Sequence, residues 1–200
     1  MKIVDLRAME SFSADCRYLY DLIDDKIKFC TVSLVIGIKT GGDIVAKDIL
    51  NNYGEHVPYF SVKKQRSSTK FKNKFSLLKK IINTLPLFMQ NQLRVTELIL
   101  NELKFKLKNN KNKSPCNMES DDVFPEITNG PIIIIDDAID SGETMMAVKE
   151  YISGVYPGHE IFVACITSTF RSPIIKADWS VYKRTIVKFP WSMDAKISHV

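Results

Sequence analysis

The chain has 200 residues, a formal net charge of +5 and 45% hydrophobic residues, an ordinary composition that is sufficient for one α/β domain with a substantial core. No apolar segment approaches the ~20 residues that a membrane span needs, and the N-terminal MKIVDLRAME lacks the apolar core of a signal peptide, so we expect a cytoplasmic protein without a membrane partner. The four cysteines lack C-x-x-C spacing, which indicates neither a zinc site nor a disulfide framework.

Helices and strands alternate along the first half of the chain. Apolar residues between positions 9 and 28 recur at helical spacing and form one stripe, and the β-branched run TVSLVIGI follows them. A Gly-Gly pair then marks a turn that opens a second helix. We predict, in chain order, a helix over 9–28, a strand over 31–38, a turn and helix over 39–50, a strand over 59–63, and helices over 75–84 and 87–107.

The second half begins with a polar stretch, 108–130, that predicts a long loop. The run PIIII (131–135) is short, apolar and β-branched, which predicts a strand buried on both faces in the middle of a parallel sheet. MMAVKEYI (145–152) returns to helical spacing, EIFVACIT (160–167) predicts another strand, and the C-terminal segment is rich in aromatic residues.

Acids and hydroxyls follow the isoleucine run directly. Asp136, Asp137 and Asp140 are three close carboxylates that repel one another unless hydroxyls, cations or N–H groups receive them. Ser141, Gly142 and Thr144 then provide hydroxyls and a permissive backbone at the start of a helix, where free N–H groups favour an anion. Ligands of open α/β sheets bind at the carboxyl ends of strands. A sugar phosphate would use both halves of this segment.

Other classes of protein also end an apolar strand in acids. P-loop nucleotidases require G-x-x-x-x-G-K-[ST], which the chain lacks. Phosphorelay receivers and aspartyl phosphatases share the acidic strand end. A purely structural role, in which Asp140 or Ser141 caps the helix, leaves the paired aspartates unexplained.

The stretch IIIIDDAIDSGET resembles the phosphoribosyl-diphosphate (PRPP) signature of type I phosphoribosyltransferases, and the enzymes for hypoxanthine, guanine and xanthine are the most similar in character. The resemblance implies an α/β fold with a central, mainly parallel sheet flanked by helices. We expect residues 1–200 to form a single domain, with a helical insertion over 75–115 and a small C-terminal hood over 171–200.

The same resemblance implies roles for the signature residues. Asp136 and Asp137 would hold the ribose hydroxyls and, through them, contact Mg²⁺ indirectly. Asp140 would lie near the reacting C1 carbon, beside the incoming nucleophile. The 5′-phosphate would be bound by the loop and the helix start that follow Asp140, which comprise Ser141, Gly142, Glu143 and Thr144.

A second loop, GIKTGGDIVA (37–46), follows the predicted strand over 31–38 and opens a helix, so its N–H groups can bind a second anion. It resembles the pyrophosphate loop of the family, which often contains a non-proline cis peptide; by alignment this bond is Lys39–Thr40. The family commonly has Arg or Lys before the two glycines, where this chain has Thr40. The PRPP contacts implied here are Lys39, Thr40, Gly41 and Gly42.

The basic segment VKKQRSSTK (62–70) lies where the family has a basic strand end. Lys63 and Lys64 are candidate catalytic contacts to pyrophosphate oxygens, followed by Gln65 and Arg66. The alternative is a solvated basic edge strand.

The segment 171–191 resembles the hood of the hypoxanthine, guanine and xanthine enzymes. In those enzymes a Lys contacts the purine O6, whereas this chain has Ser168 at that position. Ile186 occupies the position that covers the base, and we expect Ile186, Val187 and Trp191 to bind it. The alternative is that the aromatic residues here, Trp179, Tyr182, Phe189 and Trp191, only pack in the core or hood.

Together these residues predict an Mg²⁺-dependent phosphoribosyltransferase of nucleotide salvage that transfers the phosphoribosyl group of PRPP to a purine-like base and releases pyrophosphate. Homodimers are common in the family, and we expect one here. Two other functions remain open: a PRPP-sensing regulator and an effector of a bacterial defence or toxin system. Either would contact nucleic acid or a partner protein through the basic segments 63–74 and 106–113.

Overall fold

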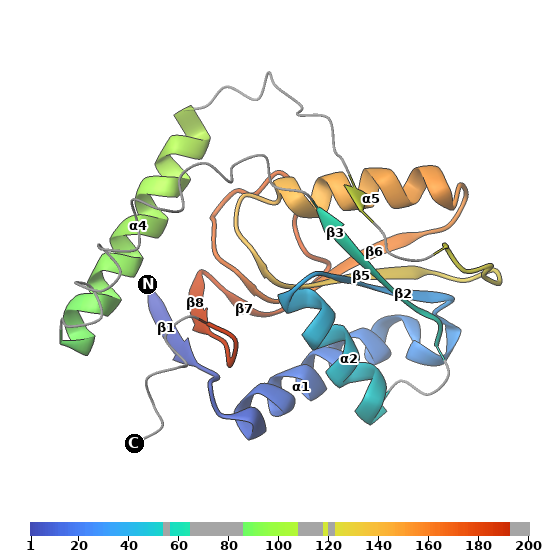
Figure 1. Ribbon diagram of the computed structural model, residues 1–200, viewed down its shortest axis with the longest axis horizontal. Helices are drawn as coiled ribbons and strands as arrows, with labels where there is room; N and C mark the ends of the chain where they lie inside the picture. The colour runs from blue at the N-terminus through green and yellow to red at the C-terminus, as the bar shows by residue number, and fades with distance from the viewer. Residues whose placement is uncertain (54–56, 65–85, 108–117, 120–122, 193–200) are drawn as a thin grey trace. The chain divides into compact units, whose positions relative to one another are not determined.

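The computed structural model describes residues 1–53, 57–64, 86–107, 118–119 and 123–192 (Figure 1). The chain forms two compact units: one contains Lys2–Lys64 and Cys116–Val200, and the other contains Gln65–Pro115 together with Met1. In the second unit, helix α4 spans Leu87–Leu107, as the sequence predicts. The helix predicted over 75–84 lies outside the described residues. No helix in the described part of the chain is long and apolar enough to cross a membrane.

The larger unit is built on one six-stranded sheet. Its strand order is β4-β3-β2-β5-β6-β7; β4 runs antiparallel to β3 at one edge, and all other neighbours are parallel. The predicted α/β class with a mainly parallel sheet is therefore confirmed. The strands are β2 (Leu34–Ile38), β3 (Tyr59–Lys64), β4 (Met118–Glu119), β5 (Ile132–Ile139), β6 (Ile161–Ser168) and β7 (Trp179–Lys183).

The isoleucine run forms the centre of this sheet, because β5 pairs with β2 on one side and with β6 on the other. Its side chains alternate between two cores. Ile133 and Ile135 pack with α1 (Met9–Ile27) and α2 (Gly41–Tyr53), whereas Ile132 and Ile134 pack with α5 (Glu143–Val155). Figure 1 shows α1 and α2 on one face of the sheet and α5 on the other. Full burial of each isoleucine contributes roughly 1.5–3 kcal/mol.

A second, two-stranded sheet joins the two ends of the chain. β1 (Lys2–Asp5) pairs in parallel with β8 (Thr185–Lys188). The sequence pattern did not predict β1, because four residues are too few to establish a period and the partner strand is far away in sequence. The predicted hood segment, 171–200, contributes to both sheets, since it contains β7 as well as β8.

Several boundaries differ from the sequence prediction. β2 begins at Leu34 because Phe29–Thr31 form a short 3-10 helix, η1. β5 continues through Asp136 and Asp137 to Ile139, so the paired acids lie on the strand and only Asp140–Gly142 form the loop. The prediction of one long loop over 108–130 is wrong at Met118–Glu119, which form β4. In the described part of that stretch, Phe124 stacks on Phe60 with ring centroids 4.3 Å apart.

A carboxylate between α1 and β7 lacks a full set of partners. The Tyr182 hydroxyl donates to Asp15 Oδ1 at 3.2 Å, while the buried Asp15 Oδ2 has no hydrogen-bond partner among the described residues. Burial raises the pKa of Asp15, and the hydrogen bond from Tyr182 opposes this effect. The same burial, together with Asp15, raises the pKa of Tyr182 to about 12. Ionised Asp15 therefore destabilises the folded state.

We predict that Asp15→Asn stabilises the protein at pH 7 but not at pH 3. The folded state binds the Asp15 proton more tightly than the unfolded state does, so native stability falls as the pH rises through the raised folded pKa. Because Asp15 is partly exposed, we expect a gain below about 1 kcal/mol. Urea unfolding at both pH values measures it. Exposed Asp25 gives the control Asp25→Asn, and equal effects of Asp15→Asn at both pH values would contradict the prediction.

Candidate functional site

Two loops meet at the carboxyl edge of the central sheet. The first runs from β2 into α2 through Lys39 and Thr40, and the second runs from β5 into α5 through Asp140–Gly142. β2 and β5 are neighbours, with Gly37 opposite Ile135. Adjacent parallel strands deliver their following loops to the same edge of a sheet. The two segments that the sequence predicts as anion sites are therefore brought together.

The first loop has the backbone that the family resemblance implies, because the Lys39–Thr40 peptide is cis. Lys39 N–H donates to the Val62 carbonyl at 2.8 Å, which connects the loop to β3. Helix α2 begins directly afterwards, at Gly41. The free N–H groups of its first turn thus lie at the sheet edge.

Both glycines are required by close packing against β5. A Cβ at Gly42 would lie 2.4 Å from the Ile135 carbonyl oxygen and 2.7 Å from Asp136 Cα, and a Cβ at Gly41 would lie 1.9 Å from Asp137 Oδ2. The start of α2 therefore contacts the acidic end of β5 directly. This packing role is additional to the anion-binding role that the sequence predicts.

The two acids of β5 accept hydrogen bonds from nearby N–H groups. Asp136 Oδ1 accepts from Asp137 N–H at 2.9 Å. Asp137 Oδ1 accepts from Ala138 N–H at 2.9 Å, and its Oδ2 accepts from the indole Nε1–H of Trp191 at 3.0 Å. Asp137 is thus held by its own strand and by the C-terminal segment. Each carboxylate oxygen retains lone-pair capacity for a further donor.

Trp191 lies beside this carboxylate and is fixed by two aromatic rings. Its ring stacks on Phe189 with centroids 4.9 Å apart and meets Phe12 edge-on at 5.2 Å. Ile186 and Val187, the other residues predicted to contact a base, lie on β8 and pair with β1. Val187 packs against the core on the α1 side, so strand alternation turns Ile186 to the opposite face.

The loop from β5 to α5 is anchored by Thr169 and by the start of the predicted hood segment, through contacts that the sequence did not predict. The Thr169 hydroxyl donates a hydrogen bond to Asp140 Oδ1, and Ile174 N–H donates to the Ser141 carbonyl at 2.9 Å. Gly142 has φ of 82°, and Ile175 atoms lie 3.0 Å from the position that a Cβ would take. Glycine is therefore required at residue 142. Glu143 and Thr144 then form the first turn of α5.

Ser168 ends β6 beside Asp140, where the resemblance implies a base-reading lysine. Its carbonyl accepts from Arg184 N–H at 2.7 Å, and Arg184 Nη1 donates to the Thr169 carbonyl at 2.8 Å. Arg184 thus brings a guanidinium to this end of the sheet. Asp140 and Thr169 directly follow Ile139 and Ser168, the paired last residues of β5 and β6, a correspondence that identifies Thr169 only once the strand order is known.

Two of the four predicted basic-segment residues lie in the described part of the chain. Lys63 and Lys64 end β3, next to β2, so their backbone reaches the same sheet edge. Gln65 and Arg66 lie outside the described residues. A further contact was missed by the sequence analysis: the Tyr59 hydroxyl donates to Asp43, which connects β3 to the first turn of α2.

The chemistry of this edge suits hydroxyls and phosphates. Among the described residues, no group of three or more His, Cys, Asp or Glu side chains could hold a metal ion. Mg²⁺ keeps several non-protein ligands and is often held by one or two carboxylates together with substrate phosphates, which fits Asp136 and Asp137. Burial and these two carboxylates raise the pKa of the nearby Cys165 thiol, so it stays protonated and does not act as a nucleophile.

The family model described as the phosphoribosyl transferase domain matches residues 7–197. Because the match spans nearly the whole chain, the protein belongs to this family of phosphoribosyl transferases. A search of the curated proteins found none that matches in sequence.

Solved structures share the fold. A xanthine-guanine-hypoxanthine phosphoribosyltransferase from Helicobacter pylori has a TM-score of 0.63 and 13% identity, with 96% of each chain covered. A purine phosphoribosyltransferase from Pyrococcus horikoshii has a TM-score of 0.58 and 16% identity, covering 96% of this chain and 95% of its own. A Neisseria gonorrhoeae protein with bound ppGpp has a TM-score of 0.55 and 13% identity, covering 98% and 93%. At these identities the likeness shows the fold.

We predict that Gly42→Ala lowers the free energy of unfolding by about 1–3 kcal/mol, since the added methyl group overlaps backbone atoms of buried β5. Gly154→Ala is the matched control, because residue 154 lies in α5 with no atom within 4 Å of the added Cβ. We expect it to raise stability by about 0.5–1 kcal/mol, owing to the cost of glycine in a helix. Urea unfolding measures both variants. Equal effects would contradict the close approach of α2 to β5.

Proposed function

We propose that this protein transfers the 5-phosphoribosyl group of PRPP to a ring nitrogen of a purine-like base and releases pyrophosphate. The observation that carries the proposal is the contact between the start of α2 and Asp137, where a Cβ at Gly41 would meet the carboxylate at 1.9 Å. This contact places the N-terminus of α2 beside Asp136 and Asp137, at the sheet edge where α5 also begins. A ligand with two phosphate groups separated by a sugar matches that pattern.

The 5′-phosphate is assigned to the segment Ser141–Thr144. Its support is a glycine with φ of 82° followed directly by the first turn of α5, an arrangement that directs free N–H groups toward an anion. The ribose hydroxyls are assigned to Asp136 and Asp137. Because Asp137 is already fixed by Ala138 and Trp191, little side-chain entropy is lost when the sugar binds.

Pyrophosphate is assigned to the loop of Lys39, Thr40, Gly41 and Gly42, assisted by Lys63 and Lys64. Donors fixed before the reaction stabilise the charge that develops on this leaving group. Mg²⁺ bound with PRPP would supply further neutralisation of the pyrophosphate charge. The C1–O bond breaks with its electron pair passing to pyrophosphate, and a C1–N bond to the base forms.

Asp140 is assigned to the incoming base. It is exposed and accepts a hydrogen bond from Thr169, which orients the carboxylate while leaving acceptor capacity. In the proposed reaction Asp140 accepts the proton that the attacking nitrogen loses. The guanidinium of Arg184, held beside Ser168 and Thr169, is assigned as the donor to a carbonyl on the base.

The purine preference is supported by the substrates that the names of the Helicobacter and Pyrococcus relatives state. Ser168 in place of a lysine favours a second candidate, a PRPP-sensing protein that does not turn over a base. Both candidates share the PRPP site and differ only in the acceptor step. We place the protein in the cytoplasm.

We predict that the native protein binds PRPP in the presence of Mg²⁺ and that Asp136→Asn/Asp137→Asn weakens this binding at least about tenfold, because neutral amides give weaker hydrogen bonds to hydroxyls. Calorimetry measures the affinity, and pyrophosphate release with a panel of purine, pyrimidine and pyridine bases identifies the acceptor. Asp25→Asn is the surface control. Binding without turnover of any base would favour the sensor, and no binding by the native protein would contradict both candidates.

We also predict that Trp191→Phe weakens PRPP binding by up to about tenfold, because Asp137 loses the donor that orients its carboxylate and ordering a side chain on binding costs about 0.5–1.5 kcal/mol. Phenylalanine keeps a ring between Phe12 and Phe189 but cannot donate to Asp137. The control is Trp179→Phe, since Trp179 packs on Phe162. Native affinity in Trp191→Phe would show that the indole hydrogen bond does not position the carboxylate.

A further inference from the structure

The first turn of α2 carries a carboxylate whose two oxygens both have a donor. Asp43 is the third residue of α2, and its side chain is 14% exposed. Its Oδ2 accepts from the Lys47 ammonium at 2.9 Å, and its Oδ1 accepts from the Tyr59 hydroxyl. The negative charge of Asp43 is therefore balanced by a cation one turn further along the same helix.

Close packing fixes the position of Asp43. A Cβ at Gly37 would lie 2.8 Å from Asp43 Cα and 3.1 Å from the Tyr59 hydroxyl oxygen, so β2, β3 and the start of α2 meet closely at this point. Asp43 also follows Gly41 and Gly42 directly, and these two residues contact the acidic end of β5. The carboxylate is thus held beside the loop to which pyrophosphate is assigned.

Lys47 is held by two contacts, although its side chain is 56% exposed. One is the ion pair with Asp43, and the other is with the Tyr59 ring, whose centroid lies 5.6 Å from the ammonium. This distance allows cation–π attraction. Tyr59 therefore contacts both charged side chains, one through its hydroxyl and the other through its ring.

Without a balancing cation, Asp43 would oppose the binding of an anion at this turn. The N–H groups at the start of a helix favour anions because the helix dipole is positive there. Pyrophosphate carries several negative charges, and a carboxylate within one helical turn, about 5.4 Å along the axis, repels it. The same carboxylate stabilises the N-terminus of α2 while no ligand is bound.

We propose that Lys47 is a positioning residue for the pyrophosphate group of PRPP. By neutralising and holding Asp43, Lys47 lets the N-terminus of α2 attract the leaving group without itself contacting the ligand. This inference rests on the proposed function, which assigns pyrophosphate to the loop that precedes Asp43. The alternative is an ordinary surface ion pair, which changes stability only slightly and leaves PRPP affinity unaltered.

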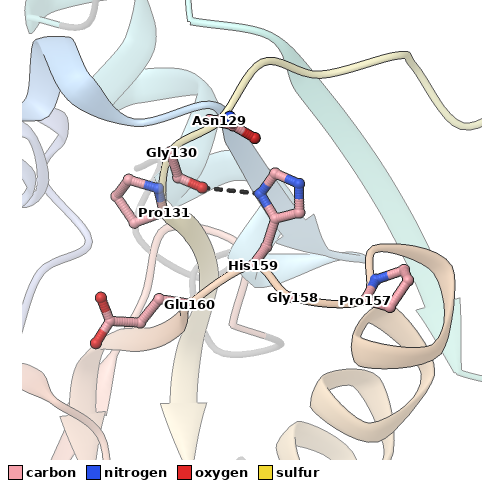
Figure 2. Close-up of a pocket in the computed structure, with 7 residues that line it drawn as sticks. All are labelled: Asn129, Gly130, Pro131, Pro157, Gly158, His159 and Glu160. Atoms are coloured by element: carbon pink, nitrogen blue, oxygen red, sulfur yellow. Dashed lines mark hydrogen bonds between the residues drawn. The ribbon is translucent and has the colours of Figure 1, made fainter.

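The opposite edge of the central sheet supplies a matched control. A cavity of about 470 Å³ lies there, and none of the described residues that line it is Lys or Arg. Figure 2 shows His159 Nδ1 directed at the Gly130 carbonyl in this cavity, 2.9 Å away. A Cβ at Gly130 would lie 2.6 Å from the carbonyl oxygen of Thr31, so η1 lies at the same edge. Lys28, which directly precedes η1 and pairs with Asp24 at 3.4 Å in the same i,i+4 arrangement, is therefore far from the proposed site.

The first test compares PRPP affinities by calorimetry with Mg²⁺. Relative to the native protein, we expect Lys47→Gln to weaken binding about three- to tenfold at about 0.05 M salt, and less than about twofold at 1 M salt, where the Debye length is about 3 Å. Lys28→Gln should stay within about twofold of native affinity at both salt concentrations. Native affinity in Lys47→Gln would overturn this inference and leave the proposed function intact, whereas a native protein that does not bind PRPP would overturn both.

The second test separates charge balance from structural support. Asp43→Asn keeps an acceptor for the Tyr59 hydroxyl and removes the negative charge, so we expect it to bind PRPP at least as tightly as the native protein. In Lys47→Gln/Asp43→Asn the affinity should return to within about twofold of the native value. Circular dichroism and urea unfolding check that each variant is folded. A double variant that binds PRPP less tightly than Lys47→Gln would show a structural role and overturn the proposal.

The third test uses the two ends of PRPP as separate ligands. Lys47→Gln should weaken the binding of inorganic pyrophosphate with Mg²⁺ by the same factor as that of PRPP. Its affinity for ribose 5-phosphate should stay within about twofold of the native value, because the 5′-phosphate is assigned to the start of another helix, α5. Equal losses for the two ligands would contradict an action of Lys47 on the pyrophosphate end.

Discussion

The contact between the first turn of α2 and the acidic end of β5 determines the geometry of the whole site. It requires two consecutive residues without side chains, because a Cβ at Gly42 would overlap the backbone of β5 and a Cβ at Gly41 would overlap the Asp137 carboxylate. The contact sets an N-terminal helix dipole beside two carboxylates. The helix N-terminus favours anions, and the two carboxylates accept hydrogen bonds from hydroxyls. The contact holds these two kinds of group next to each other.

The rest of the fold supports this contact. Four consecutive isoleucines hold β5 between two cores, so the strand cannot shift to relieve crowding at its end. The C-terminal segment returns to the same point, where Trp191 donates to Asp137, while Thr169 and Ile174 fix the adjacent loop. Three separate parts of the sequence thus converge on residues 136–142. A site preorganised in this way loses little entropy when a ligand binds.

Local patterns were sufficient to predict the main elements of the fold, and to place the Gly-Gly turn and the Asp140–Gly142 loop each between a strand and a helix. The helix stripe of α1, the isoleucine strand and the helix over 87–107 each have a clear period, and the Lys39–Thr40 cis peptide followed from the family resemblance. Contacts between distant segments were not predictable. β1 is only four residues long and pairs with β8 near the other end of the chain, and no local signal relates Trp191 to Asp137 or Tyr59 to Asp43. The Gly-Gly pair predicted a turn and an anion site, but its close packing depends on which strand lies beside β2.

The central claim is that the α2 loop and the β5 acids form one PRPP site through the contact of Gly41 with Asp137. A double-mutant cycle of Gly41→Ala and Asp137→Asn on PRPP affinity, measured by calorimetry with Mg²⁺, tests it most directly. If the alanine methyl acts by displacing the Asp137 carboxylate, each single substitution lowers PRPP affinity. The double variant then has the same affinity as the single variant that binds PRPP less tightly. Fully additive losses, or native affinity in Gly41→Ala, would contradict the account.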